Sequence, residues 1–199
     1  MTNVREPKQE RSINKKNNII DKGFELMCNK GYFNTTTPDI ANAAGISTGS
    51  VYQYFNDKHD IFIAGVKKYS ERIMFPIIDV LNKSDFDDLE FLTNMVIDEY
   101  IKCHNISLKA HEELLAMSHL DSEVFNVLKD AELMMTKKIA SIFEDKGYQI
   151  DDVKEKLHVI TNIIDNFCHE IVYHKHTELD YSVMKKVVIY SIIGILKQS

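Results

Sequence analysis

Apolar residues recur every three or four positions along most of the chain, which is the spacing of an amphipathic α-helix. We expect a first helix from Arg11 to Asn29, ended by Lys30 and Gly31, because glycine can adopt the left-handed conformation that closes a helix. Only 7 glycines and 3 prolines occur in 199 residues, which favours long helices over β-hairpins. The same spacing predicts later helices at 86–103, 108–119, 123–146, 151–175 and 181–197. The pattern therefore predicts an all-α fold.

Two shorter helices are predicted between residues 36 and 55. Thr36 and Asp39 have the spacing of a capping box, and Gly45 permits a tight turn after the first short helix. Ser47 is a good N-cap for the second, which we expect to extend to about Tyr54. Its apolar Val51 and Phe55 should face the core. The remaining side chains should face outward: Thr48, Gly49, Ser50, Tyr52, Gln53 and Tyr54.

A long helix is predicted to start at Lys58, with Asp57 as its cap. Pro76 falls inside this helical pattern. Because proline lacks a backbone N–H and its ring clashes with the preceding turn, we expect a kink or break there, with the helix resuming to about Asn82.

Residues 13–66 resemble the DNA-binding domain of the tetracycline-repressor (TetR) family of transcription regulators. The resemblance is carried by Gly31-Tyr32, Thr36, Asp39-Ile40-Ala41, Ala44-Gly45-Ile46-Ser47, Gly49-Ser50-Val51-Tyr52, Tyr54-Phe55, Lys58 and Ile61-Phe62. It implies an all-α protein with a three-helix helix-turn-helix head at residues 1–57 and a larger ligand-binding and dimerisation body at 58–199. Met1–Glu10 is expected to be a mobile arm.

The resemblance implies a homodimer that binds a near-palindromic DNA operator as a repressor and is released by a small molecule. The implied DNA contacts are Ser47, Thr48, Ser50, Tyr52, Gln53, Tyr54 and Lys58. We add Gly49, which lets the backbone come close to DNA, and Thr36 and Thr37, whose hydroxyls can contact phosphates. Hydroxyls and lysine suit phosphates, whereas Gln53 can pair bidentately with adenine. The chain departs from the family pattern at Thr48 and Pro38, where basic residues are common, and at Gln53, where His or Tyr is frequent.

The final predicted helix is apolar around nearly its whole circumference, so it must be covered on more than one side. A partner subunit is one cover, and burial within a single chain is the alternative. Together with the preceding helix, it predicts a four-helix dimer interface. The interface residues we expect are Ile164, Phe167, Ile171, Val188, Ile192 and Ile195.

Residues 80–180 are rich in methionine and aromatic side chains, which suit either an ordinary core or an adaptable ligand pocket. Candidate ligand contacts are Phe75, Tyr100, His104, Met117, Met134, Asn166, His169, Glu170 and Tyr173. A metal site at His169, His174 and His176 with Glu170 is a weaker alternative, so we assign no metal and no cofactor. A constitutive DNA-binding regulator without an effector is the other alternative.

Charge and cysteine content complete the prediction. The net charge is −6, but residues 1–30 hold seven basic and four acidic side chains, so the predicted head has a locally basic end. Cys28, Cys103 and Cys168 have no metal-binding spacing, and no signal-peptide core or bilayer-spanning run is evident. We expect a cytoplasmic DNA-binding protein that binds no membrane. No catalytic motif is present in the sequence, so we do not expect an enzyme.

Overall fold

A computed structural model describes residues 10–104 and 108–197, and within them every regular element is an α-helix. Met1–Gln9 of the predicted arm lie outside the described residues, whereas Glu10 begins the first helix. The all-α prediction is confirmed. The helices are α1 Glu10–Lys30, α2 Thr37–Ala43, α3 Thr48–Val51, α4 Lys58–Lys83, α5 Leu89–Cys103, α6 Leu108–Leu120, α7 Ser122–Asp145, α8 Val153–Tyr173 and α9 Tyr181–Lys197.

The helices form two compact units. Unit 1 comprises Met1–Ser70 and Ile106–Lys129, and unit 2 comprises Glu71–Asn105 and Asp130–Ser199. Helices α4 and α7 each contribute residues to both units. The domain boundary predicted between residues 57 and 58 stays a prediction, since it concerns which part binds DNA.

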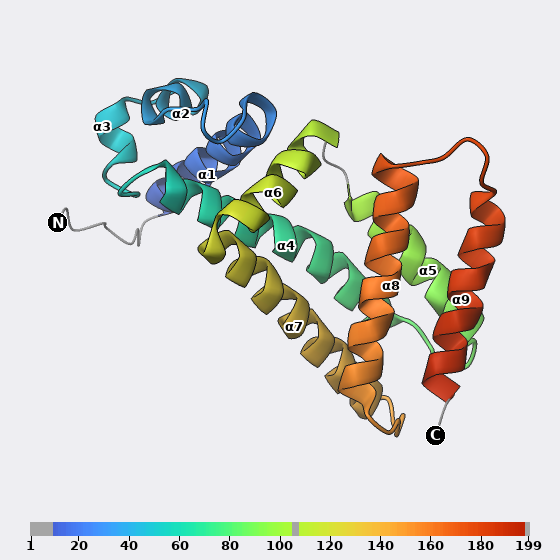
Figure 1. Cartoon of the computed structure of the whole chain (residues 1–199). Helices are drawn as coiled ribbons and strands as arrows, with labels where there is room; N and C mark the ends of the chain where they lie inside the picture. Colours follow the sequence, from blue (N-terminus) through green and yellow to red (C-terminus); the bar gives the residue numbers. More distant parts are fainter. Residues whose placement is uncertain (1–9, 105–107, 198–199) are drawn as a thin grey trace. The chain divides into compact units, whose positions relative to one another are not determined.

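Unit 1 contains α1 to α3, the first part of α4, α6 and the start of α7 (Figure 1). Its core includes Ile19, Met27, Ile40, Ile61 and Phe62, all fully buried. The helices approach closely where glycine removes a side chain: a Cβ on Gly65 of α4 would overlap the ring of Phe24 in α1. These contacts fix the platform from which α2 and α3 project.

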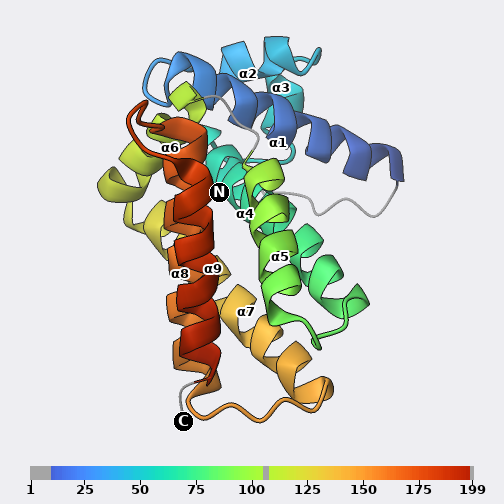
Figure 2. The same cartoon turned by 90° about the vertical axis from the view of Figure 1, so that its right-hand side faces the viewer.

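Unit 2 is a helical bundle in which α8 and α9 run antiparallel alongside each other (Figures 1 and 2). Helix α5 packs against both of them. The shared core includes Ile77 and Leu81 of α4, Ile97 of α5, Phe143 of α7 and Cys168 of α8. Burial, followed by the charge of nearby Asp165, raises the pKa of the Cys168 thiol, so this cysteine stays protonated at neutral pH.

The prediction at Pro76 was a kink or a break. A break is wrong, because α4 continues through Pro76 from Lys58 to Lys83, whereas a kink stays a prediction. Proline in a helix interior costs about 3 kcal/mol through its lost hydrogen bond and ring clash. Met74, Ile77 and Leu81 are buried on both sides of it, and this packing holds the helix together.

Candidate nucleic-acid interface

Helix α2 is fixed by a complete capping box. The Thr36 hydroxyl accepts a hydrogen bond from the Asp39 backbone N–H, and the Asp39 carboxylate accepts one from the Thr36 backbone N–H at 2.9 Å. Lys30 donates a further hydrogen bond to the same carboxylate at 2.9 Å. The Thr36 hydroxyl, then Lys30, lower the pKa of Asp39 to about 2. The predicted cap is confirmed.

The turn between α2 and α3 depends on Gly45, whose φ of 68° lies in the left-handed region. Asn18 of α1 donates a hydrogen bond to the Ala44 carbonyl at 2.9 Å and so fastens the turn to α1. After the turn, Ser47 caps α3 by accepting a hydrogen bond from the Ser50 backbone N–H. The sequence pattern predicted Gly45 and Ser47, whereas nothing in it pointed to Asn18.

Helix α3 ends at Val51, earlier than the predicted Tyr54, and turns follow it. Val51 and Phe55 are buried as expected. Tyr52 is 46% exposed and Gln53 is also exposed. Gly49 is exposed, and a Cβ added to it would meet no neighbouring residue within 4 Å. Thr48 and Ser50 are half-buried.

The expectation that Tyr54 faces outward is wrong. Its side chain is only 8% exposed, and its hydroxyl hydrogen-bonds the Ser12 hydroxyl of α1 at 2.9 Å. The reason is that the chain leaves the helical path after Val51, so the helical spacing no longer gives the direction of residue 54. Ser12 is a supporting residue that the sequence did not reveal.

Lys58, which the sequence analysis placed among the DNA contacts, is hydrogen-bonded within the protein. Its ammonium donates hydrogen bonds to the carbonyls of Tyr32 at 2.7 Å and Thr35 at 2.8 Å, and it lies 4.5 Å from the centre of the Tyr32 ring. These contacts tie the start of α4 to the loop before α2. Thr36 is exposed and Thr37 half-buried at the start of α2.

The geometry is therefore a helix-turn-helix: α2, a tight glycine turn, and a short α3 followed by exposed Tyr52 and Gln53. Residues 19–64 match the family model described as bacterial regulatory proteins, tetR family. The chain belongs to the tetR family. Its members are DNA-binding transcription regulators rather than enzymes, which agrees with the function class predicted from the sequence.

Relatives of this tetR-family chain include the biofilm operon negative transcriptional regulator IcaR of Staphylococcus aureus, which is 28% identical over 136 residues, 65% of this chain and 70% of IcaR. A tetR-family regulator from Mesorhizobium loti has the same fold, with a TM-score of 0.76 at 20% identity, covering 94% of this chain and 98% of that one. The fatty acid degradation regulator FadR from Bacillus halodurans gives a TM-score of 0.65 at 22% identity. The match covers 98% of this chain and 100% of FadR.

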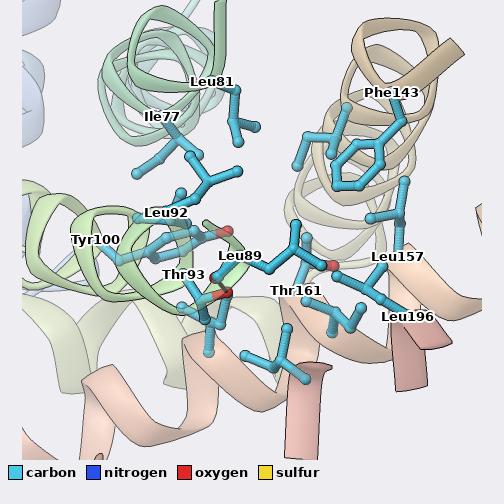
Figure 3. A pocket seen from close by; sticks show the side chains of 15 residues that line it. Ile77, Leu81, Leu89, Leu92, Thr93, Tyr100, Phe143, Leu157, Thr161 and Leu196 are labelled. Carbon is cyan, nitrogen blue, oxygen red and sulfur yellow. Dashed lines mark hydrogen bonds between the residues drawn. The ribbon is translucent and has the colours of Figure 1, made fainter. Parts of the chain in front are cut away.

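Unit 2 of this tetR-family protein contains a cavity of about 50 Å³ (Figure 3). Leu81, Leu92, Tyr100 and Phe143 are among the side chains around it. Within residues 10–104 and 108–197, the only polar side-chain groups that line it are the hydroxyls of Tyr100, Thr93 and Thr161. The Tyr100 hydroxyl donates to the Met135 sulfur at 3.2 Å. The cavity is thus lined mainly by aliphatic groups.

Only Tyr100 among the predicted ligand contacts lines this cavity. Phe75, Met134 and Asn166 are exposed, and Met117 is buried in unit 1.

His104, His169 and Tyr173 lie together near the end of α5, where the Tyr173 hydroxyl donates to the His104 carbonyl at 3.1 Å. Burial lowers the pKa of His169. Glu170 accepts a hydrogen bond from Tyr181 at 2.8 Å.

The predicted dimer residues divide into two groups. Ile164, Phe167 and Ile192 are buried in the core of unit 2, so we correct their assignment: they are not available to a partner in this conformation. Ile171, Val188 and Ile195 are half-buried against that core. The apolar residues that α9 does expose are Val183, Val187 and Tyr190.

No helix within residues 10–104 and 108–197 has the length and apolarity needed to cross a membrane.

Proposed function

We propose that this protein is a homodimeric, cytoplasmic repressor that binds a near-palindromic operator through α3 and is released by a small molecule. The observation that carries the proposal is the exposure of Tyr52 and Gln53 directly after α3, on a segment anchored by buried Val51 and Phe55. A rigid scaffold with exposed aromatic and amide side chains suits groove binding. The description of IcaR as a negative regulator supports repression.

Gln53 is the side chain we assign to base reading, because its amide can pair with adenine in the major groove. We assign Tyr52, Thr36, Thr37, Ser47, Thr48 and Ser50 to the DNA backbone, with Gly49 allowing close approach. Tyr54 is left out because it is buried, and Lys58 is assigned to positioning the loop before α2.

A mobility-shift assay tests these roles, using DNA fragments selected from the source genome. Gln53→Ala should relax preference at one base position by about 1–3 kcal/mol, whereas Tyr52→Ala should weaken binding to all sequences. Phe125→Ala, which removes an exposed aromatic ring from α7, is the matched control and should bind like the unmodified protein. Equal loss on every sequence in the Gln53 variant would remove its base-reading role.

We assign the effector to the apolar cavity of unit 2. We expect a small, largely hydrocarbon molecule, since the described residues line the cavity with aliphatic and aromatic groups and three hydroxyls. The similarity to FadR, a fatty acid degradation regulator, supports acyl compounds as the first panel to test. By linkage, effector and operator must weaken each other's binding by the same factor.

Val96 lines the cavity, so Val96→Phe should fill it and abolish release from DNA by an active compound without weakening operator binding. Val159→Phe, on the exposed side of α8, is the control. If no compound in a broad panel affects the mobility shift, the protein is a constitutive regulator, and the effector part of this proposal fails.

A further inference from the structure

Two histidines and one carboxylate meet in unit 2, outside the apolar cavity. His104 caps the C-terminal end of α5, and Asp165 and His169 lie one turn apart on α8. The His104 Nε2 atom is 3.3 Å from Asp165 Oδ1, and the His169 Nδ1 atom is 3.7 Å from Asp165 Oδ2. The ligand atoms of all three lie within 4.8 Å of one another.

The Tyr100 carbonyl determines which ring nitrogen of His104 carries a proton. Nδ1 is 2.8 Å from the Tyr100 carbonyl oxygen, which can only accept a hydrogen bond, so Nδ1 carries a proton. In the neutral imidazole, Nε2 then presents a lone pair to the carboxylate of Asp165. Two lone pairs repel at this distance unless a cation lies between them or Nε2 also carries a proton. A backbone carbonyl that orients an imidazole in this way is typical of metal-binding histidines.

The spacing also fits a metal ion. Zinc bonds to nitrogen and oxygen are about 2.0–2.2 Å long, so two ligands of a tetrahedral ion are roughly 3.3–3.6 Å apart. The separation of 3.3 Å lies within that range, and the separation of 3.7 Å lies just beyond its upper end. The side chain of His104 is 1% exposed, whereas those of Asp165 and His169 are 43% and 27% exposed, so solvent can reach the site from one side.

We propose that His104, Asp165 and His169 bind one first-row divalent metal ion of the zinc class, with solvent in the remaining coordination position. Two imidazoles and one carboxylate favour such an ion over magnesium or calcium, which prefer sites built from oxygen ligands alone. The site differs from the histidine group considered from the sequence. His174 and His176 are exposed beyond or at the end of α8, and His169 instead meets His104, with ring centres 5.0 Å apart.

The test uses the full-length, untagged protein, stripped with a chelator and titrated with Zn²⁺ and with Co²⁺ as a spectroscopic probe. We expect one ion per chain, a visible Co²⁺ spectrum of a four-coordinate site, and a rise in the melting temperature with Zn²⁺. His104→Gln and His169→Gln should each lower the affinity at least tenfold. His176→Gln, whose side chain is 68% exposed, is the matched control and should bind like the unmodified protein.

Circular dichroism of the stripped variants shows whether each one is folded. If the buried His104 variant unfolds, the more exposed His169 variant still decides the question. The proposal is overturned if the stripped protein binds no ion, if folded His169→Gln binds Zn²⁺ as tightly as the unmodified chain, or if His176→Gln alone loses the ion. A doubly protonated His104 paired with Asp165 in the presence of Zn²⁺, seen by nitrogen NMR, would equally overturn it. None of these readouts depends on DNA binding, so they test the metal site independently of the proposed repressor function.

Discussion

Lys58 shows how one side chain holds the DNA-binding segment together. Its ammonium donates to the carbonyls of Tyr32 and Thr35, and it lies over the Tyr32 ring. Hydrogen bonds to a charged group contribute about 1.5–3 kcal/mol when partly shielded from water. A lysine whose donors are used in this way stabilises the loop before α2 and is less free to contact a phosphate.

Lys58→Met keeps the aliphatic stem and removes the ammonium. It should lower the free energy of unfolding by about 1–3 kcal/mol, because two carbonyls lose a charged donor. Urea unfolding measures this, with Lys67→Met on the exposed side of α4 as the control. Unchanged stability combined with weaker DNA binding would instead mean that the ammonium serves the DNA.

Side-chain direction after Ser47 was predicted only in part. Val51 and Phe55 were correctly expected inside, because both contribute to the apolar face of the segment. Tyr54 was misplaced because α3 ends at Val51, and a four-residue helix gives no signal of its own end. Its hydrogen-bond partner Ser12 lies 42 positions away in sequence, and contacts at that distance leave no local pattern.

The packing of α1 against α4 depends on glycine. A Cβ on Gly65 would overlap the Phe24 ring, and a Cβ on Gly23 of α1 would come too close to Ile61 and Ile40. Glycine lowers the helix propensity at these two positions, but it lets neighbouring helices approach closely. The two glycines set the position of α4 relative to α1 within unit 1.

Gly65→Ala should therefore destabilise the protein by about 1–3 kcal/mol, because the new methyl group forces the half-buried Phe24 ring to move. Gly194→Ala in α9 is the control: no atom lies within 4 Å of its added Cβ, and alanine favours the helix by up to about 1 kcal/mol. Thermal unfolding of both variants measures the difference. Equal stability of the two would show that Phe24 moves aside at no cost.

The cap of α2 should make stability depend on pH in the acid range. The pKa of Asp39 is lowered from 3.8 to about 2, mainly by the Thr36 hydroxyl and then by Lys30. A lowered pKa means that the folded state prefers the carboxylate. The contribution is therefore fully present above about pH 4 and is lost as the pH falls toward 2.

Asp39→Asn removes this contribution, so its unfolding free energy should depend less on pH between 4 and 2 than that of the unmodified protein. Urea titrations at several pH values measure the two slopes. Glu112→Gln, in an exposed position of α6, should leave the slope unchanged. A slope that is the same in all three proteins would mean that the cap does not depend on the charge of Asp39.

The sequence located the long helices well, since each has a strong apolar periodicity and recognisable ends. Helix α9 was predicted at the same residues that it occupies, Tyr181–Lys197. The helix does not break at Pro76 because buried neighbours, which no local rule counts, hold it together there. The three proposed metal ligands could not be grouped from the sequence for a similar reason: His104 follows α5, whereas His169 lies in α8.

Assembly depends on which face of α9 remains uncovered. An all-round apolar helix gives no signal of its inward side, so the sequence could not separate core from interface. In the structure Ile192 is buried, whereas Val183, Val187 and Tyr190 lie three or four positions apart and are exposed. We place the proposed dimer contact on this stripe.

Val187→Glu should convert the proposed dimer into folded monomers, because a charge on the exposed stripe opposes burial against a partner. Ile192→Glu should instead unfold unit 2, because it places the charge in the core. Light scattering reports the mass and circular dichroism reports the fold. A Val187 variant that remains dimeric would place the interface elsewhere.

Helix α6 has a practical consequence for work on the DNA-binding head. It packs on α1 within unit 1, and its Glu113 accepts a hydrogen bond from the Tyr32 backbone N–H at 2.5 Å. A fragment ending after Asn56 or Ser70 would lack this helix and leave part of α1 exposed to water. Anyone wishing to study operator recognition in isolation would do better to keep the gene intact than to shorten it.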